Sequence, residues 1–160
     1  SPLTLMKPTF VVEHVQTQKQ LEDALGVRRR VFIEEQSVPE TIERDDFDHW
    51  EPGREDVLHV VGYLGEKPVA AGRVVMTSAG SGVPKIGRIA VLKSVRGEGL
   101  GAEIMKFVHR LSASKGALSL RLSAQCHALS FYRSLGYEPV GEVYLEAEIE
   151  HQMMEYRFKG

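Results

Sequence analysis

The chain has 160 residues, of which 42% are hydrophobic and 26% are charged, and its formal net charge at pH 7 is −2. A chain of this length buries roughly two-thirds of its unfolded surface as one domain, so it needs neither disulfides nor a metal to complete a core. The nearly balanced charge gives no reason to expect a nucleic acid or a membrane as partner, and a small-molecule partner is favoured.

Cys126 is the only cysteine, which excludes an intrachain disulfide and fits a reducing compartment such as the cytoplasm. The first eight residues lack the apolar run of an export signal, and no segment approaches ~18 consecutive apolar residues. The six histidines are scattered, without partner cysteines at metal-ligand spacing. We therefore expect a cytoplasmic protein without a membrane span or a metal, either a monomer or a homodimer.

The N-terminal part is predicted to form a strand over residues 9–15. A helix follows, opened by a capping box in which Thr17 and Gln20 exchange hydrogen bonds. Residues 34–56 break the helical pattern and contain ten of the 22 acidic residues. This stretch is predicted to be an acidic loop or an irregular helical excursion.

The rest of the chain alternates strand and helix patterns. Strands are predicted over residues 57–64, 69–77, 85–92, 118–124, 137–144 and 152–158, helices over 100–116 and 128–135, and a Gly/Ser loop over 78–84. The order is β-α-β-β-β-α-β-α-β-β. The fold class expected is α+β, a single domain over residues 1–160 with a mixed sheet of about seven strands flanked by helices.

A glycine-rich turn, Arg-Gly-Glu-Gly-Leu-Gly over residues 96–101, joins a predicted strand to an amphipathic helix. Glycines let a ligand approach the backbone, and the free amides at a helix start attract anions. The turn also fits a dinucleotide fingerprint, but residues 118–125 hold no acid for the ribose. An ATP-type loop would need Lys and then Ser or Thr where Ala102 and Glu103 stand. A phosphate cradle is favoured, with a simple capping turn as the alternative.

This turn, read as Arg96-x-x-Gly99-x-Gly101, resembles the central signature of the GNAT acetyltransferase superfamily. Residues 122–125 (Leu-Ser-Ala-Gln) and 128–137, with Phe-Tyr and Leu-Gly-Tyr, resemble the strand and helix that follow in that superfamily. Further motifs over 27–39 and 142–154 are similar to the ElaA-like and YjcF-like subgroup, so the resemblance covers nearly the whole chain.

Two departures from the subgroup stand out. Members often carry Gly-Ile-Pro-His near the end, where this chain has Glu148-Ile149-Glu150-His151, so we expect a different loop there. Some YjcF-like members have an acid at the position of Gly87. Because glycine has no side chain, a base at this position is excluded here.

The resemblance implies an enzyme that moves an acetyl group from acetyl-CoA directly to the primary amine of a small molecule. In the family, the fourth strand splays from its neighbour, pantetheine pairs with its backbone and the pyrophosphate rests on the glycine turn. The cofactor-binding residues implied are Ile89, Ala90, Val91, Arg96, Gly97, Glu98, Gly99, Leu100, Gly101, Gln125, Ala128 and Phe131. The substrate-binding residues expected are Arg28, Phe32, Gln36 and Arg73.

The chemistry needs a base and an acid. Deprotonation of an alkylammonium with a pKa of about 10.4 costs roughly 4 to 5 kcal/mol at pH 7. Candidate bases or substrate contacts are Glu35, His59 and His151, each of which also has a purely structural interpretation. The resemblance implies Tyr132 as the general acid for the departing thiolate, although its spacing alone also fits a core residue. Cys126 is assigned no catalytic role.

The sequence allows two chemical classes of acceptor. The acidic stretch could attract a cationic amine or polyamine, whereas arginines such as Arg28, Arg73 and Arg88 could hold a carboxylate or phosphate. Two rival functions are an acyl-CoA-binding sensor without turnover and an acetyltransferase for protein or peptide amines.

Overall fold

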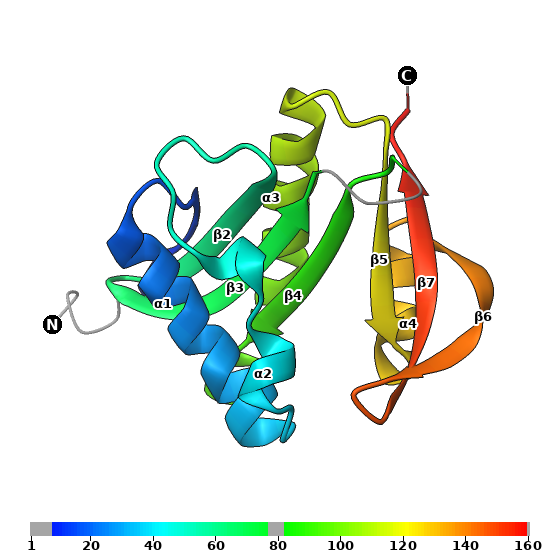
Figure 1. Ribbon diagram of the computed structural model, residues 1–160, viewed down its shortest axis with the longest axis horizontal. Coiled ribbons are helices and arrows are strands. Elements are labelled where there is room, and N and C mark those ends of the chain that lie inside the picture. The colour runs from blue at the N-terminus through cyan, green and yellow to red at the C-terminus, as the bar shows by residue number, and fades with distance from the viewer. Residues whose placement is uncertain (1–7, 77–81, 160) are drawn as a thin grey trace, which may run out of the picture.

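The computed structural model describes residues 8–76 and 82–159 of the chain. Seven strands form one mixed sheet in the order β1-β2-β3-β4-β5-β7-β6 (Figure 1). The strands are β1 Phe10–His14, β2 Val57–Leu64, β3 Lys67–Val75, β4 Lys85–Val91, β5 Ser119–Gln125, β6 Glu138–Glu146 and β7 Ile149–Arg157. Every neighbouring pair is antiparallel except β4 and β5.

Helices cover both faces of the sheet (Figure 1). The helical segments are α1 Gln18–Arg28, the π-helical η2 Arg29–Glu35, α2 Glu40–Glu43, η3 Asp46–Asp48, η4 Lys93–Val95, α3 Leu100–Ser114, η5 Cys126–Ala128 and α4 Leu129–Ser134. Helices α1 and α2 lie in front of the sheet in this view, whereas α3 lies behind it.

Each layer of helices has its own core, because the strands alternate side chains between the two faces. On the α1 face, Leu21 and Ala24 pack in one cluster with Val61 of β2. On the α3 face, Ile104 and Val108 are fully buried in a second cluster. Burial of these two apolar helix stripes fixes the helices against the sheet, which is what positions the loops between them.

The sheet divides between β4 and β5. These strands pair in parallel at only two positions, Lys85 with Arg121 and Ile86 with Leu122, and they separate beyond them. Strand β4 also carries a bulge opposite β3, where Arg88 has a φ of 57°. Because a bulge bends the strand, it turns the second half of β4 away from β5. Figure 1 shows the gap that opens between the two strands.

The predicted order of elements and the α+β class with seven strands are confirmed. The acidic stretch over residues 34–56 was predicted as a loop or as an irregular helical excursion. It is the helical excursion, and it contains α2 and η3. The strand predicted from residue 69 begins two residues earlier, at Lys67, which pairs with Leu64, so the intervening turn is short, and Gly65 in it takes a φ of 60°. Thr77 and most of the predicted loop over 78–84 lie outside the described residues.

Candidate active site

A cleft of about 610 Å³ opens where β4 and β5 separate. One wall is formed by β4, including Ile89, Ala90 and Val91, and by η2. The other wall is formed by Ser123 and Gln125 of β5 and by the β6–β7 hairpin. The cleft therefore follows directly from the unpaired edges of the two strands.

The glycine turn leads from the cleft into α3. Gly97 and Gly99 have φ values of 84° and 80°, which glycine adopts without strain, and a Cβ at either position would meet no atom within 4 Å. The first intrahelical bond of α3 runs from the amide of Glu103 to the carbonyl of Gly99. The amides of the three residues before Glu103 therefore have no acceptor within the helix and are available to an anion.

Arg96 joins this turn to η2. Its guanidinium donates to both carboxylate oxygens of Glu35 at 2.6 Å and to the carbonyl of Val91 at 2.9 Å. Hydrogen bonding to Arg96 holds the pKa of Glu35 below its ordinary value. Glu35 is therefore an anchor for the glycine turn and a poor proton acceptor, and the Arg96 side chain is engaged by protein groups.

Tyr132 lies on α4 and lines the cleft. Its ring contacts Phe131 and Tyr137 edge-on, and its hydroxyl has no hydrogen-bond partner among the described residues. Burial raises the pKa of Tyr132 to about 12, so the phenol stays protonated at neutral pH. A protonated, partnerless phenol in a cleft can donate a hydrogen bond to a group that enters it.

His151 lies on β7, and it also lines the cleft. Its Nδ1 is 2.7 Å from the carbonyl oxygen of Ile149, which can only accept, so Nδ1 carries the proton. In the neutral ring Nε2 then has a free lone pair, and it lies 3.5 Å from Oε2 of Glu146. A lone pair beside a carboxylate is suited to take up a proton.

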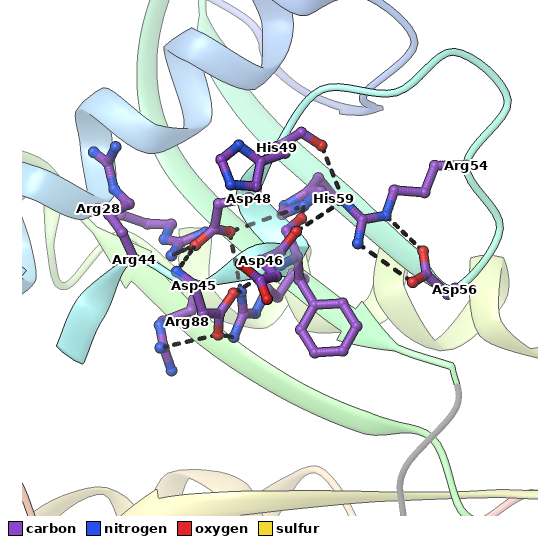
Figure 2. Close-up of polar contacts among 12 residues, drawn as sticks. Arg28, Arg44, Asp45, Asp46, Asp48, His49, Arg54, Asp56, His59 and Arg88 are labelled. Atoms are coloured by element: carbon purple, nitrogen blue, oxygen red, sulfur yellow. Dashed lines mark hydrogen bonds and ion pairs between the residues drawn. The ribbon is translucent and has the colours of Figure 1, made fainter. Parts of the chain in front are cut away.

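The structure does not bring Arg28 and Arg73 into the cleft, where we expected them to bind substrate. Arg28 is buried and donates to both oxygens of Glu43 at 2.8 Å. It also donates to both oxygens of Asp48, at 2.7 and 3.0 Å (Figure 2). Arg73 is buried as well and donates to Asp45 and Asp48. These acids and arginines fasten the acidic excursion to the sheet, because a buried charge needs a partner.

His59 is also separated from the cleft. It is buried on β2, and its Nε2 lies 2.8 Å from the carbonyl of Phe47. Desolvation lowers the pKa of His59, and its Nδ1 is buried without a hydrogen-bond partner. The geometry therefore supports a structural role for His59 (Figure 2).

The remaining predicted residues fall into two groups. Phe32, Gln36, Gln125 and Ala128 line the cleft, and Gln125 Nε2 donates to Gln36 Oε1 at 3.0 Å, a bond that links β5 to the end of η2. The other group lies beyond the cleft along the start of α3: the turn residues Gly97, Glu98, Gly99, Leu100 and Gly101, and Phe131, whose ring approaches Gly101.

Comparisons with known proteins agree with this geometry. Residues 14–158 match the family model of the acetyltransferase (GNAT) domain. The chain is 42% identical over 138 residues to YjcF of Bacillus subtilis (strain 168), which is named as an uncharacterized N-acetyltransferase, covering 86% of this chain and 92% of YjcF. The chain belongs to the GNAT acetyltransferase family.

Further relatives extend the match. The GNAT chain is 33% identical over 134 residues to ElaA of Escherichia coli (strain K12), covering 82% of this chain and 84% of ElaA. The crystal structure of E. coli ElaA superposes with a TM-score of 0.79 over 95% of this chain and 100% of that one, at 28% identity. An acyl-CoA N-acyltransferase from Pseudomonas aeruginosa superposes with a TM-score of 0.78 over 93% and 99% of the two chains, also at 28% identity. This GNAT protein is an acyltransferase.

Sequence reasoning did not single out Glu146 as the neighbour of His151, or Lys85 as part of the cleft. A short hairpin between the last two strands could have indicated this neighbour. In it Glu146 pairs with Ile149, which brings the carboxylate of Glu146 beside His151. Within the residues that the structure describes, no three His, Cys, Asp or Glu side chains are grouped to hold a metal. No described helix is long and apolar enough to cross a membrane.

Proposed function

We propose that this chain transfers an acetyl group from acetyl-CoA directly to the primary amine of a small molecule. The observation that carries the proposal is the cleft at the β4–β5 separation, which holds the partnerless Tyr132 hydroxyl and, on its other wall, Nε2 of His151 beside the Glu146 carboxylate. Family membership and the acyl-CoA N-acyltransferase fold support the reaction class.

The donor fits one end of this site. The open glycine turn and the free amides at the start of α3 would hold the pyrophosphate, since a helix start favours negative charge. The separated edge of β4 from Ile89 to Val91 would pair with the pantetheine amides. When bound there, the thioester supplies the activated acyl group.

His151 is the base in this proposal. Its Nε2 takes the proton of the acceptor amine, and Glu146 stabilises the imidazolium that results. Nδ1 keeps its bond to the Ile149 carbonyl throughout, which fixes the orientation of the ring. The amine nitrogen then forms the new bond to the acyl carbon, and the carbon–sulfur bond breaks.

Tyr132 assists the departing sulfur by donating a hydrogen bond. Complete proton transfer from a phenol with a pKa of about 12 to a thiolate of pKa about 8.5 would cost about 5 kcal/mol. Tyr132 therefore stabilises the developing charge. An ammonium acceptor loses two protons: His151 takes the first before attack, and the second, lost from nitrogen as the amide forms, balances the thiol that is released.

The test is thiol release from acetyl-CoA against amines, amino acids, amino sugars and basic peptides, in the parent and in Tyr132→Phe. We expect at least one acceptor to react, and Tyr132→Phe to lower kcat about 10²-fold without weakening CoA binding. Tyr63→Phe is the matched control, because Tyr63 lies on β2 with its hydroxyl bonded to Asp23. Binding of acetyl-CoA without turnover of any acceptor would instead support the sensor function.

A further inference from the structure

Two cations on the same strand line the cleft. Lys85 and Arg88 of β4 both line the cleft, and Gly87 lies between them. The side-chain ammonium of Lys85 has no ion pair or hydrogen bond among the described residues. Arg88 is turned by the strand bulge, with its φ of 57°, toward the excursion that carries α2.

Arg88 is paired with a carboxylate less closely than the arginines beside it, because no carboxylate among the described residues accepts a hydrogen bond from it. Its Nε and Nη2 donate only to the backbone carbonyls of Ile42 and Glu43. The nearest acid is Asp45, at 3.7 Å, and both of its oxygens already accept from Arg73. Nη1 of Arg88 has no partner among the described residues, so the guanidinium keeps free donors, and its charge is only partly balanced by the ion pair with Asp45.

The charge balance around Arg88 supports this view. Burial lowers the pKa of Arg88, the neighbouring charges of Arg73 and Arg28 lower it further, and Glu43 and Asp45 only partly compensate. An uncompensated cation at the edge of a cleft is stabilised by an anion that binds there.

Space for such an anion lies between the two cations. A Cβ built at Gly87 would meet no atom within 4 Å, so the strand surface there is open. The cleft lining includes Gly87 itself. A group placed over Gly87 would therefore have Lys85 on one side and Arg88 on the other, with the base His151 on the far wall.

We propose that Lys85, Gly87 and Arg88 form an oxyanion subsite, so that the acceptor is an amine that also carries a carboxylate or phosphate. This inference rests on the proposed acetyltransferase function and narrows its acceptor class. Most acids that would attract a polyamine are already paired: Glu43, Asp45 and Asp48 are bound by arginines, and Glu146, which lines the cleft, lies beside His151. Guanidinium and ammonium groups together hold oxyanions through charge-assisted hydrogen bonds.

The experiment compares matched acceptors by kcat/KM for thiol release from acetyl-CoA. The pairs are β-alanine with propylamine, L-phenylalanine with 2-phenylethylamine, and phosphoethanolamine with ethanolamine. We expect the anionic member of at least one pair to be preferred tenfold or more, and the pair that shows it distinguishes carboxylate from phosphate. Lys85→Gln is expected to reduce that preference at least threefold, mainly through KM.

Gly87→Asp tests the position of the subsite, because it places a carboxylate in the open space. We expect it to abolish the preference for the anionic acceptor, whereas the nearly isosteric, neutral Gly87→Asn keeps most of it. An equal loss in both variants would show a steric effect and overturn the inference. Thermal denaturation of each variant checks that it is folded.

The possible failures are distinguishable. If the neutral member of every pair reacts as well as its anionic partner, the subsite is wrong and the acetyltransferase function stands. If no acceptor releases thiol while acetyl-CoA binds, the proposed function fails and the subsite inference fails with it.

Discussion

Tyr132 and His151 differ in how the protein holds their polar atoms. The Tyr132 hydroxyl meets no protein group among the described residues, whereas the His151 ring is fixed by the Ile149 carbonyl. A fixed imidazole with one free nitrogen accepts a proton from a defined direction, and a free hydroxyl can follow a leaving group. Both side chains come from the C-terminal half of the sheet and its helix α4.

Removal of the base should affect turnover more than binding. We expect His151→Gln to lower kcat by 10²- to 10³-fold and to change the KM for acetyl-CoA less than threefold, because the glycine turn is untouched. Glu146→Gln should have a smaller effect of the same kind, since Glu146 only stabilises the imidazolium. Steady-state kinetics with an acceptor identified by the thiol-release assay measures kcat and KM of both variants. A His151→Gln variant with parental kcat would exclude His151 as the base.

The sequence could place Tyr132 because its motif is local, but it could not separate the cleft residues from the buried ones. Arg28 and Arg73 carry a charge that suits substrate binding equally well. Their partners are Glu43, Asp45 and Asp48, which are 15 to 28 positions away and approach only when the excursion folds onto α1 and the sheet. Nothing in the local pattern of either arginine predicts that pairing.

At the scale of elements, the β6–β7 hairpin has an unusual turn. Its two turn residues, Ala147 and Glu148, have φ values of 50° and 62°, a conformation that glycine and asparagine favour. The resemblance to the subgroup implies glycine at the position of Glu148, so the sequence predicts a different loop here. The difference is a strained backbone at a residue that is not glycine. The turn borders the cleft, since Ala147 lines it.

Relief of this turn should stabilise the protein. We expect Ala147→Asn with Glu148→Gly to raise the free energy of unfolding by about 1 to 2 kcal/mol, which corresponds to a Tm increase of roughly 2 to 8 °C. Differential scanning calorimetry measures it. Glu150→Gly is the matched control, because Glu150 lies in β7, where glycine should destabilise. A Tm for the double variant at or below that of the parent would contradict the strain argument.

The ion pair between η2 and the glycine turn should matter for the donor. Because Arg96 and Glu35 are partly exposed, we expect Glu35→Gln to change stability by less than about 1 kcal/mol. The KM for acetyl-CoA should rise about threefold to tenfold, since a looser turn loses preorganisation. Glu34→Gln, an exposed neighbour, is the control, and an unchanged KM in Glu35→Gln would show that the pair does not support the turn.

The whole molecule should lose stability toward acid in two stages. Desolvation lowers the pKa of His59, so its contribution to stability is complete above about pH 6.5 and is lost as pH falls. Burial alone would raise the pKa of Asp48, but hydrogen bonds and charge from Arg28 and Arg73 outweigh it and hold that pKa well below its usual range. The Asp48 contribution is therefore present above about pH 4 and is lost below it.

A substitution can separate the first stage from the second. We expect His59→Gln to reduce the decline in stability between pH 7 and pH 5, while the decline below pH 4 remains. Desolvation also lowers the pKa of His14 and of His109, so their share of the first stage remains. Urea unfolding at a series of pH values measures it. His49→Gln, at an exposed histidine, should keep the parental profile, and identical profiles for His59→Gln and the parent would show that His59 is not the group responsible.

The two-position pairing of β4 with β5 also has a consequence for the lifetime of the protein. On the proposed binding mode, the donor acts as a missing strand that closes the seam between the two parts of the sheet. A ligand that binds only the folded form adds about 2.7 kcal/mol of stability at one hundred times its Kd. Proteases that cut the transiently opened seam would then degrade the enzyme fastest when acyl-CoA is scarce. The abundance of the enzyme would thereby follow the supply of its own donor.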